Sequence, residues 1–488
     1  MRKSGILMHI SSLPGPFGIG TMGKTAYEFV DFLCAAGQSY WQILPLSPTG
    51  YGDSPYQAFS AFAGNPYLID PELLHQQGLL TQQELAAFDW GNGSRVDYGK
   101  LHRDREKLLR LAFCRFSPDE EYQSFLQQNP WLEDYALFMA IKGRFGGQSW
   151  HTWPLPLMMH TRVALAACKL EQDEDIRFQY FVQYLFHRQW HALKQYANDR
   201  GVRIVGDVPI YVPLDSADVW ANPELFLLDE TRRPQMVAGC PPDSFSADGQ
   251  LWGNPLYNWE KMKASDYHWW IQRLAAAVQM YDVVRLDHFR GFESYWAIPA
   301  EDTTAVNGKW MPGPGSDFIQ AMHKAFPSKT FIAEDLGFIT EEVRQLQLES
   351  GYPSMKVLEF AFDSREAGNY LPHLYPNNSV CYTGTHDNAT LKQWFDEASA
   401  EDVAMARTYL GLHEAEGYVW GMIRGAMSSI SDLCIVQMQD YLQLGGEARM
   451  NIPGTLSTSN WSWRAAPGFA TEALSERIRK ITRCYGRL

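Results

Sequence analysis

Two acidic residues in this sequence each follow directly after a short apolar run. Asp287 follows Val283–Leu286, and Glu334 follows Thr330–Ala333. Side chains alternate along a strand, so Arg285 shares a face with Asp287, where a guanidinium keeps a carboxylate ionised as a nucleophile requires. A glutamate that leaves an apolar strand is partly desolvated, which raises its pKa toward that of a general acid. The structural alternatives are an Arg–Asp ion pair at a strand end and a helix cap at Glu334 or Asp335.

A third strand-like run, Ser379–Thr383, is followed by His386 and Asp387. The structural alternative for this pair is an ordinary Asx turn. Retaining glycoside chemistry needs one nucleophilic and one proton-donating carboxyl group, and a third anion can stabilise the oxocarbenium-like transition state. Three strand-end acids in succession therefore indicate a retaining glycoside site, with Asp287 as nucleophile and Glu334 as general acid and base.

These acids need a scaffold that brings strand ends together. Short apolar runs alternate with helix-like stretches, which is typical of a parallel sheet. The acids, including Asp207, sit just after such runs, as they do when an active site lies at the C-terminal mouth of a (β/α)8 barrel. The earlier runs are Ile6–Ile10, Tyr40–Leu46 and Val202–Val205, and a helix is expected over Thr25–Ala36. We therefore predict an α/β fold of the (β/α)8 TIM-barrel type.

Two stretches interrupt this alternation. Residues 70–200 contain amphipathic helical segments, which predict a largely helical insertion. These segments are Gln82–Phe88, Asp104–Phe113, Trp131–Gly143 and Asp173–Tyr196. Residues 211–262 are rich in Pro, Gly, Asp and Asn, which predicts a loop-rich substrate-binding insertion. We expect a single catalytic barrel over residues 1–488 that carries both insertions.

The composition narrows the class of partner. The chain has a formal charge of −14 at pH 7 and no basic cluster, so nucleic acid and an anionic membrane surface are poor partners, and a neutral ligand fits better. Aromatic residues make up 14% of the chain; sugars stack on such rings, although a large aromatic core is an equal alternative. The seven cysteines are scattered, and no signal peptide or apolar run of about 18 residues is seen, so we expect a cytoplasmic enzyme.

Two further motifs could suggest a cofactor or a metal. Gly18–Gly23 matches G-x-G-x-x-G, but the next strand-like run ends in Leu46–Pro48 and lacks the acid that a dinucleotide site needs. His187 and His191 are spaced as metal ligands on a helix, but the glutamate of that motif and a third ligand are missing. We interpret the first as a glycine-rich turn and the histidines as packing or surface residues, and we expect no cofactor and no catalytic metal.

Long segments of the chain resemble the 4-α-glucanotransferase family of the α-amylase clan, which is glycoside hydrolase family 77, the amylomaltases or disproportionating enzymes. The resemblance spans nearly the whole chain and implies a barrel with inserted subdomains and no separate C-terminal β-domain. Its marks are Ser11–Gly20, Leu44–Tyr56, Ser60–Tyr67, Gly206–Val212, Gly239–Asp243, Leu251–Tyr257, Arg285–Gly291, Ala333–Gly337, Thr385–Asn388 and Arg449–Gly454.

The resemblance implies cleavage of an α-1,4-glucan donor by retaining double displacement, with transfer of the glucanosyl segment to the 4-hydroxyl of glucose or another glucan. It matches Asp287 to the family nucleophile, Glu334 to the acid/base and Asp387 to the transition-state stabiliser. It implies substrate contacts for a further set of residues: Arg285, His386, Asp207, Tyr56, Ser54, Trp252, Asn254, Asp243 and Tyr51.

Two positions depart from the family pattern. Ser244 stands where the family usually has Tyr, in a loop over the cleft at 239–248, which puts acceptor preference in question. Ser459 stands where the family usually has Gly. An α-glucan hydrolase of the same clan would use the same acids, with water instead of a sugar intercepting the intermediate. An inactive glucan-binding protein would need a broken acid set, and this chain keeps all three acids.

Overall fold

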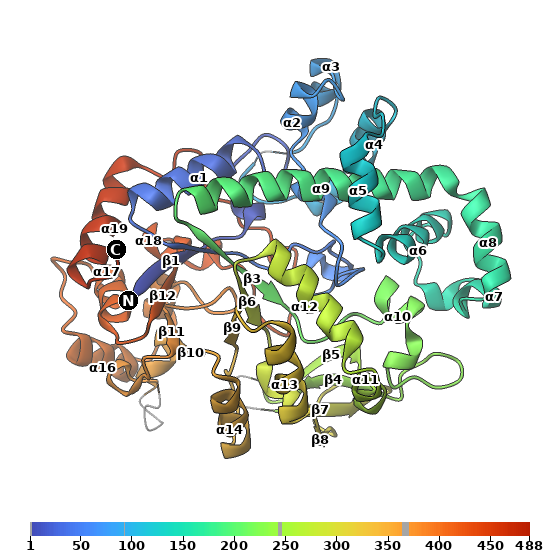
Figure 1. Ribbon diagram of the computed structural model, residues 1–488. Coiled ribbons are helices and arrows are strands. Elements are labelled where there is room, and N and C mark those ends of the chain that lie inside the picture. Colours follow the sequence, from blue (N-terminus) through green and yellow to red (C-terminus); the bar gives the residue numbers. More distant parts are fainter. Residues whose placement is uncertain (1, 92, 243–245, 364–369) are drawn as a thin grey trace.

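Eight parallel strands close into a barrel in the computed structural model, which describes residues 2–91, 93–242, 246–363 and 370–488 (Figure 1). Around the barrel the order is β1-β12-β11-β10-β9-β6-β3-β2. The strands are β1 (Lys3–Leu7), β2 (Tyr40–Gln42), β3 (Arg203–Val208), β6 (Val283–Leu286), β9 (Thr330–Ala333), β10 (Ser354–Val357), β11 (Ser379–Tyr382) and β12 (Leu433–Gln437). The predicted (β/α)8 barrel is confirmed.

The barrel strands are apolar because both of their faces are buried. Every residue of β6, β11 and β12 is buried, as expected for parallel strands that side chains fill from inside and helices cover from outside. Polar side chains therefore concentrate at the strand ends. This distribution places the candidate acids at one rim of the barrel.

Helices return the chain between strands and cover the outside of the barrel (Figure 1). The first of them, α1 (Lys24–Ala35), joins β1 to β2 and buries Phe29, Val30 and Leu33. The later ones are α12 (His268–Met280), α13 (Gly315–Ala325), α14 (Glu341–Ser350), α15 (Leu391–Glu397), α16 (Ala400–Leu410), α17 (Tyr418–Ser428), the short α18 (Met438–Tyr441) and α19 (Glu472–Cys484).

Between β2 and β3 the described chain is mainly helical. Its longest helix, α9, packs against α1 and leads into β3, while α6 to α8 lie at its far end, away from the barrel (Figure 1). The helices are α2 (Pro71–Gln76), α3 (Gln82–Ala86), α4 (Tyr98–Phe113), α5 (Glu120–Gln128), α6 (Leu132–Arg144), α7 (Leu155–Met158), α8 (Arg162–Glu171) and α9 (Asp173–Asp199).

A small antiparallel sheet lies outside the barrel. Its order is β5-β4-β7-β8, formed by β4 (Met236–Cys240), β5 (Gln250–Pro255), β7 (Ser294–Pro299) and β8 (Lys309–Pro312). Residues 211–262 therefore contain two strands, together with α10 (Ala217–Ala221) and α11 (Trp259–Ala264), and are more regular than their composition predicts. The reason is long-range pairing: β4 hydrogen bonds β7, which lies in the sequence after β6.

The predicted strand boundaries agree best with the observed ones where the apolar run has sharp ends. Val283–Leu286 and Thr330–Ala333 match β6 and β9, whereas β10 and β12 were not predicted. After β12, the described residues form helices and loops without a further sheet. Within the part of the chain that is described, no helix is both long and apolar enough to cross a membrane.

Candidate active site

Four of the candidate acids come from barrel strands at their C-terminal ends. Asp207 lies within β3 and pairs in register with Arg285 of β6. Asp287 directly follows β6 and Glu334 directly follows β9, and the last residues of these two strands are partners in the barrel. Asp387 follows β11, beyond β10. The parallel register therefore brings residues from distant parts of the chain to one rim.

Arg285 is the centre of charge at this rim. Its Nη1 donates to both carboxylate oxygens of Asp207, at 2.8 and 2.7 Å, and to Oδ1 of Asp287 at 2.9 Å. The side chains of Arg285 and Asp207 are 5% and 1% exposed, whereas that of Asp287 is 26% exposed. One guanidinium is thus shared by a buried acid and by the acid that faces the opening.

Burial has a larger effect on Asp287 than its ion pair does. Burial raises the pKa of Asp287, Arg285 opposes this shift, and the negative charges of Asp207 and Glu334 reinforce it. The sequence predicts only the lowering by Arg285. The difference arises first from burial, and then from the negative charge of Asp207, which shares the Arg285 guanidinium; sequence spacing reveals neither.

Glu334 is held by backbone N–H groups from both sides. The N–H of His288 donates to its Oε2 at 2.7 Å, and the N–H of Leu336 donates to its Oε1 at 2.8 Å. His288 adopts a left-handed backbone conformation (φ 52°), which is uncommon for a residue with a Cβ and turns the chain immediately after Asp287. The turn after the candidate nucleophile thereby fixes the carboxyl group of the candidate proton donor.

The two candidate catalytic acids influence each other's protonation. Burial raises the pKa of Glu334, while Arg285 and the two backbone N–H groups lower it. Two enclosed carboxyl groups that repel each other, one buried and one partly exposed, cannot both ionise easily, so the pair retains a proton at higher pH than ordinary carboxyl groups would. The direct hydrogen bond from Arg285 stabilises the charge on Asp287, and the two backbone N–H groups stabilise the charge on Glu334.

Asp387 lies in the loop after β11, and the segment that follows the last barrel strand, β12, orients it. Nδ2 of Asn451 donates to its Oδ1 at 2.7 Å, and Nη2 of Arg449 donates to its backbone carbonyl at 2.6 Å. His386 Nε2 lies 3.4 Å from the same Oδ1, and burial lowers the pKa of this imidazole. The Asp387 side chain stays 44% exposed and therefore accessible to a ligand.

Tyr56 connects the two sides of the site. Its hydroxyl donates to Oδ2 of Asp207 at 2.7 Å, and its ring stacks on His386 with centroids 5.1 Å apart. Trp461 packs on both rings. Ser54 Oγ accepts a hydrogen bond from the backbone N–H of Tyr56 at 3.2 Å, so Ser54 orders the turn that presents this tyrosine.

Two further candidate residues lie on β5. Trp252 meets His288 edge to face, with ring centroids 4.8 Å apart, which places it beside the Asp287 turn. Asn254 is buried, and its Oδ1 accepts from Gln57 Nε2 at 3.4 Å. Tyr51 opens the short turn of 3₁₀-helix Tyr51–Asp53.

Two predicted positions lie outside the described residues, and three residues at the site were not predicted. Asp243 and Ser244 lie outside the described residues, so their placement stays a prediction. Arg449, Asn451 and Trp461 were not predicted as site residues, although Arg449–Gly454 stood out as a family motif; only the barrel brings them to Asp387 and Tyr56. Within the described residues, no group of three His, Cys, Asp or Glu side chains could hold a metal ion.

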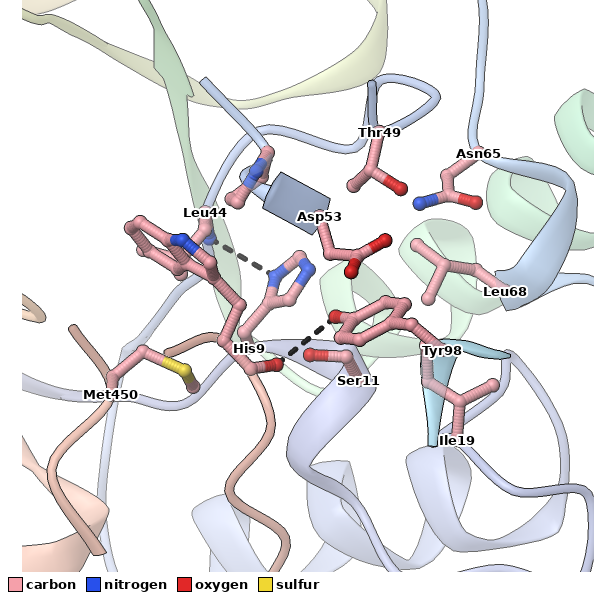
Figure 2. Close-up of a pocket in the computed structure, with 12 residues that line it drawn as sticks. His9, Ser11, Ile19, Leu44, Thr49, Asp53, Asn65, Leu68, Tyr98 and Met450 are labelled. Carbon is pink, nitrogen blue, oxygen red and sulfur yellow. Dashed lines mark hydrogen bonds between the residues drawn. The ribbon is translucent and has the colours of Figure 1, made fainter. Parts of the chain in front are cut away.

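A small cavity lies next to the segment that follows β1 (Figure 2). Its volume is about 10 Å³, which suits one water molecule and excludes a sugar. Leu44 N–H donates to Nδ1 of His9 at 3.2 Å, and burial together with His386 lowers the pKa of His9 to about 3. Thr49 and Asp53 also line the cavity. The cavity therefore does not account for the binding of a sugar.

Fold and site together have the arrangement of a barrel enzyme that acts on glycosidic bonds. The sequence profile of glycoside hydrolase family 77, described as 4-alpha-glucanotransferase, matches residues 8–470. The chain belongs to the 4-α-glucanotransferase family. This finding confirms the resemblance seen in the sequence and the enzyme class predicted from it.

Individual relatives agree over their full lengths. The chain is 47% identical to a 4-alpha-glucanotransferase of Clostridium butyricum, covering 98% of this chain and 100% of the relative. It is 47% identical to one of Thermus thermophilus, covering 100% and 99%. A solved amylomaltase of Streptococcus agalactiae, in complex with acarbose, superposes with a TM-score of 0.97 at 42% identity over all of both chains. The amylomaltase of Corynebacterium glutamicum, at 18% identity and a TM-score of 0.76 over 98% of this chain and 73% of that one, shares the fold.

Proposed function

We propose that the chain cleaves α-1,4-glucans by retaining double displacement and transfers the glucanosyl segment to the 4-hydroxyl of glucose or another glucan. The observation that carries the proposal is the bridge of Arg285 between Asp207 and Asp287, with Glu334 held beside them at the same strand ends. The acarbose complex of the related amylomaltase supports a sugar ligand for this fold.

In the first half of the reaction, an oxygen of Asp287 attacks the anomeric carbon of the donor. The glycosidic bond breaks, and its electron pair goes to the leaving oxygen, which takes the proton of Glu334. The donor segment is then an ester of Asp287. Arg285 supports this step because it stabilises the ionised form of the nucleophile through its 2.9 Å hydrogen bond.

In the second half, Glu334 acts as a base. It accepts the proton of an acceptor 4-hydroxyl, whose oxygen attacks the anomeric carbon and releases Asp287 as a carboxylate. Both acids return to their starting protonation states. Because the nucleophile and the proton donor are side chains, the proposed chemistry requires no cofactor and no metal.

The surrounding residues have proposed binding roles. Asp387 stabilises the positive charge that develops on the sugar, and His386, Tyr56 and Asp207 contact the sugar bound at the acids. Further contacts to donor and acceptor rings are proposed for Ser54, Tyr51, Trp252, Asn254, Asp243 and Arg285. We propose one catalytic barrel over residues 1–488 that carries two insertions, the helical residues 70–200 and the substrate-binding residues 211–262. We also propose that the protein is cytoplasmic.

Transfer and hydrolysis differ in their products from a short donor. Incubation of the purified protein with maltotriose is expected to give glucose together with a ladder of longer oligosaccharides, since a sugar intercepts the glycosyl-enzyme. Products limited to glucose and maltose would show that water intercepts it and would refute transfer. The reaction is followed by chromatography of the products with time.

The nucleophile assignment has its own test. Asp287→Asn is expected to reduce the transfer rate by at least about 10³-fold, which is several kcal/mol of barrier, because an amide cannot form the ester. A matched control is Asp282→Asn, which changes an acid just before β6, at the opposite end of that strand. Near-parental turnover of Asp287→Asn would rule out the nucleophile assignment.

A further inference from the structure

Asp440 is a buried acid that lies outside the set of proposed catalytic residues. It belongs to α18, which directly follows the last barrel strand, and its side chain is 1% exposed. Its Oδ2 accepts from the hydroxyl of Thr383 at 2.7 Å, and its Oδ1 accepts from the backbone N–H of Leu391 at 2.7 Å. Each carboxylate oxygen is therefore engaged by a different donor.

These two donors bracket the loop that carries His386 and Asp387. Thr383 is the first residue after β11, and Leu391 is the first residue of α15. Both are fully buried. A single carboxylate thus fixes the beginning and the end of the loop, and the separation between its two ends is set by the width of one side chain.

The loop is also packed closely from behind. A Cβ on Gly384 would lie 2.8 Å from Nε2 of Gln437 and 2.8 Å from Oε1 of Glu359, so a side chain there would have to displace these two groups. Gln437 Nε2 donates to the backbone carbonyl of Ala389 at 3.2 Å. The loop therefore rests on Gln437, at the end of β12, and on Glu359, which follows β10, and we expect the loss of either end contact to move Asp387.

We propose that Asp440 is a positioning residue for the transfer reaction, which acts by holding both ends of the loop that presents Asp387 and His386. The proposal rests on the proposed function, because it takes Asp387 to stabilise the transition state. Interactions made only in the transition state affect kcat more than KM. Misplacement of Asp387 should therefore appear mainly in kcat.

The central test removes one of the two hydrogen bonds and keeps the shape of the side chain. Thr383→Val is expected to lower kcat for maltotriose transfer about tenfold or more while KM changes less than about threefold. Thr383→Ser, which keeps the hydroxyl, is expected to stay within about threefold of the parent in both constants. Asp440→Ala, which removes both hydrogen bonds, should lose at least as much kcat as Thr383→Val. If Thr383→Val does not fold, Thr383→Cys supplies the weaker donor in its place.

A matched control lies on the same strand. Ser379 is also fully buried, at the other end of β11; its hydroxyl donates to the backbone carbonyl of Pro376 at 2.6 Å and shares a 2.7 Å hydrogen bond with the hydroxyl of Ser431. Ser379→Ala removes a buried, hydrogen-bonded hydroxyl, as Thr383→Val does, but this hydroxyl does not contact the loop. Its thermal midpoint should fall about as much as that of Thr383→Val, while its kcat stays at the parental value.

A further comparison shows whether Thr383 acts through Asp387. With an activated donor such as a maltosyl fluoride, Thr383→Val should change the residual rate of Asp387→Asn less than about twofold, because the group being positioned is then missing. Parental kcat in Thr383→Val, equal losses in Val and Ser variants, or an undiminished loss in the Asp387→Asn background would each overturn the proposal. Parental transfer by Asp387→Asn alone would instead overturn the role of Asp387 in the proposed function.

Discussion

Burial raises the pKa of several carboxyl groups around the site, and these groups differ in what compensates them. Asp287 shares the guanidinium of Arg285. Asp440, whose pKa burial raises to about 7, accepts two hydrogen bonds that oppose the shift. Glu359 is the least compensated, because its Oε1 has no hydrogen-bond partner among the described residues. The pKa of Glu359 is raised well above 4.5, first by burial and then by Asp440, while Arg449 lowers it.

Glu359→Gln is expected to change how stability depends on pH. Folding raises the pKa of this carboxyl group above its unfolded value near 4.5. Below that pH the group is protonated in both states and does not lower the free energy of unfolding. As the pH rises from there toward the pKa of the folded state, the free energy of unfolding falls. Glutamine does not ionise, so the variant should unfold at a higher temperature than the parent at a pH of about 8, and the difference should vanish at about 4. Thermal midpoints across this range provide the measurement, and parallel curves would contradict the assignment of a neutral Glu359.

At the scale of elements, helix α9 holds in place the segment that follows Tyr56 of the site. Two buried glutamines of this helix, Gln183 and Gln189, hydrogen bond the backbone of that segment, and we call this pair the glutamine clamp. Gln183 accepts from the N–H of Gly64 at 2.7 Å and donates to its carbonyl at 2.9 Å. Gln189 makes the same pair of bonds with Asp70, at 2.7 and 3.2 Å. The helix thereby pairs with an irregular segment as a neighbouring strand would.

Gln183→Leu tests this contact. The substitution leaves the buried N–H and carbonyl of Gly64 without partners, so the free energy of unfolding should fall by about 3 kcal/mol. Gln195→Leu is the control on the same helix, since Gln195 is exposed and, among the described residues, its side chain bonds Asp199, four residues away. It should change stability by less than about 0.5 kcal/mol. Urea unfolding of both variants measures the difference, and equal stabilities would show that α9 holds this segment by other contacts.

Sequence reasoning reached these elements unevenly, for physical reasons. Helix α9 and strand β6 were predictable because their patterns are local. Asp287 and Glu334 could be singled out because they follow apolar runs. The glutamine clamp, the sharing of Arg285 with Asp207 and the contact of Asn451 with Asp387 join residues far apart in the chain, and no local pattern encodes them. The small sheet was missed for the same reason, since β4 pairs with strands on both sides of β6 in sequence.

For the whole molecule, the barrel must close between its first and last strands. β1 pairs in parallel with β12, and Figure 1 shows the two marked chain ends close to this junction. Arg487 is fully buried there and donates to the backbone carbonyls of Lys3, Met427, Ser429 and Ser431. One side chain thus joins the start of β1 to the segments that lead into β12.

Arg487→Met is expected to weaken this closure. Methionine fills much of the same space but leaves the buried carbonyls without their donor, so the free energy of unfolding should fall by about 3 kcal/mol or more. The control is Arg483→Met on α19, an exposed arginine whose replacement should change stability by less than about 0.5 kcal/mol. Urea unfolding gives the free energies, and hydrogen exchange locates the effect. If Arg487 secures the junction, the amides of β1 and β12 lose more protection than those of β6, which lies on the far side of the barrel order. Uniform loss across all strands would show that Arg487 stabilises the fold as a whole and not its closure.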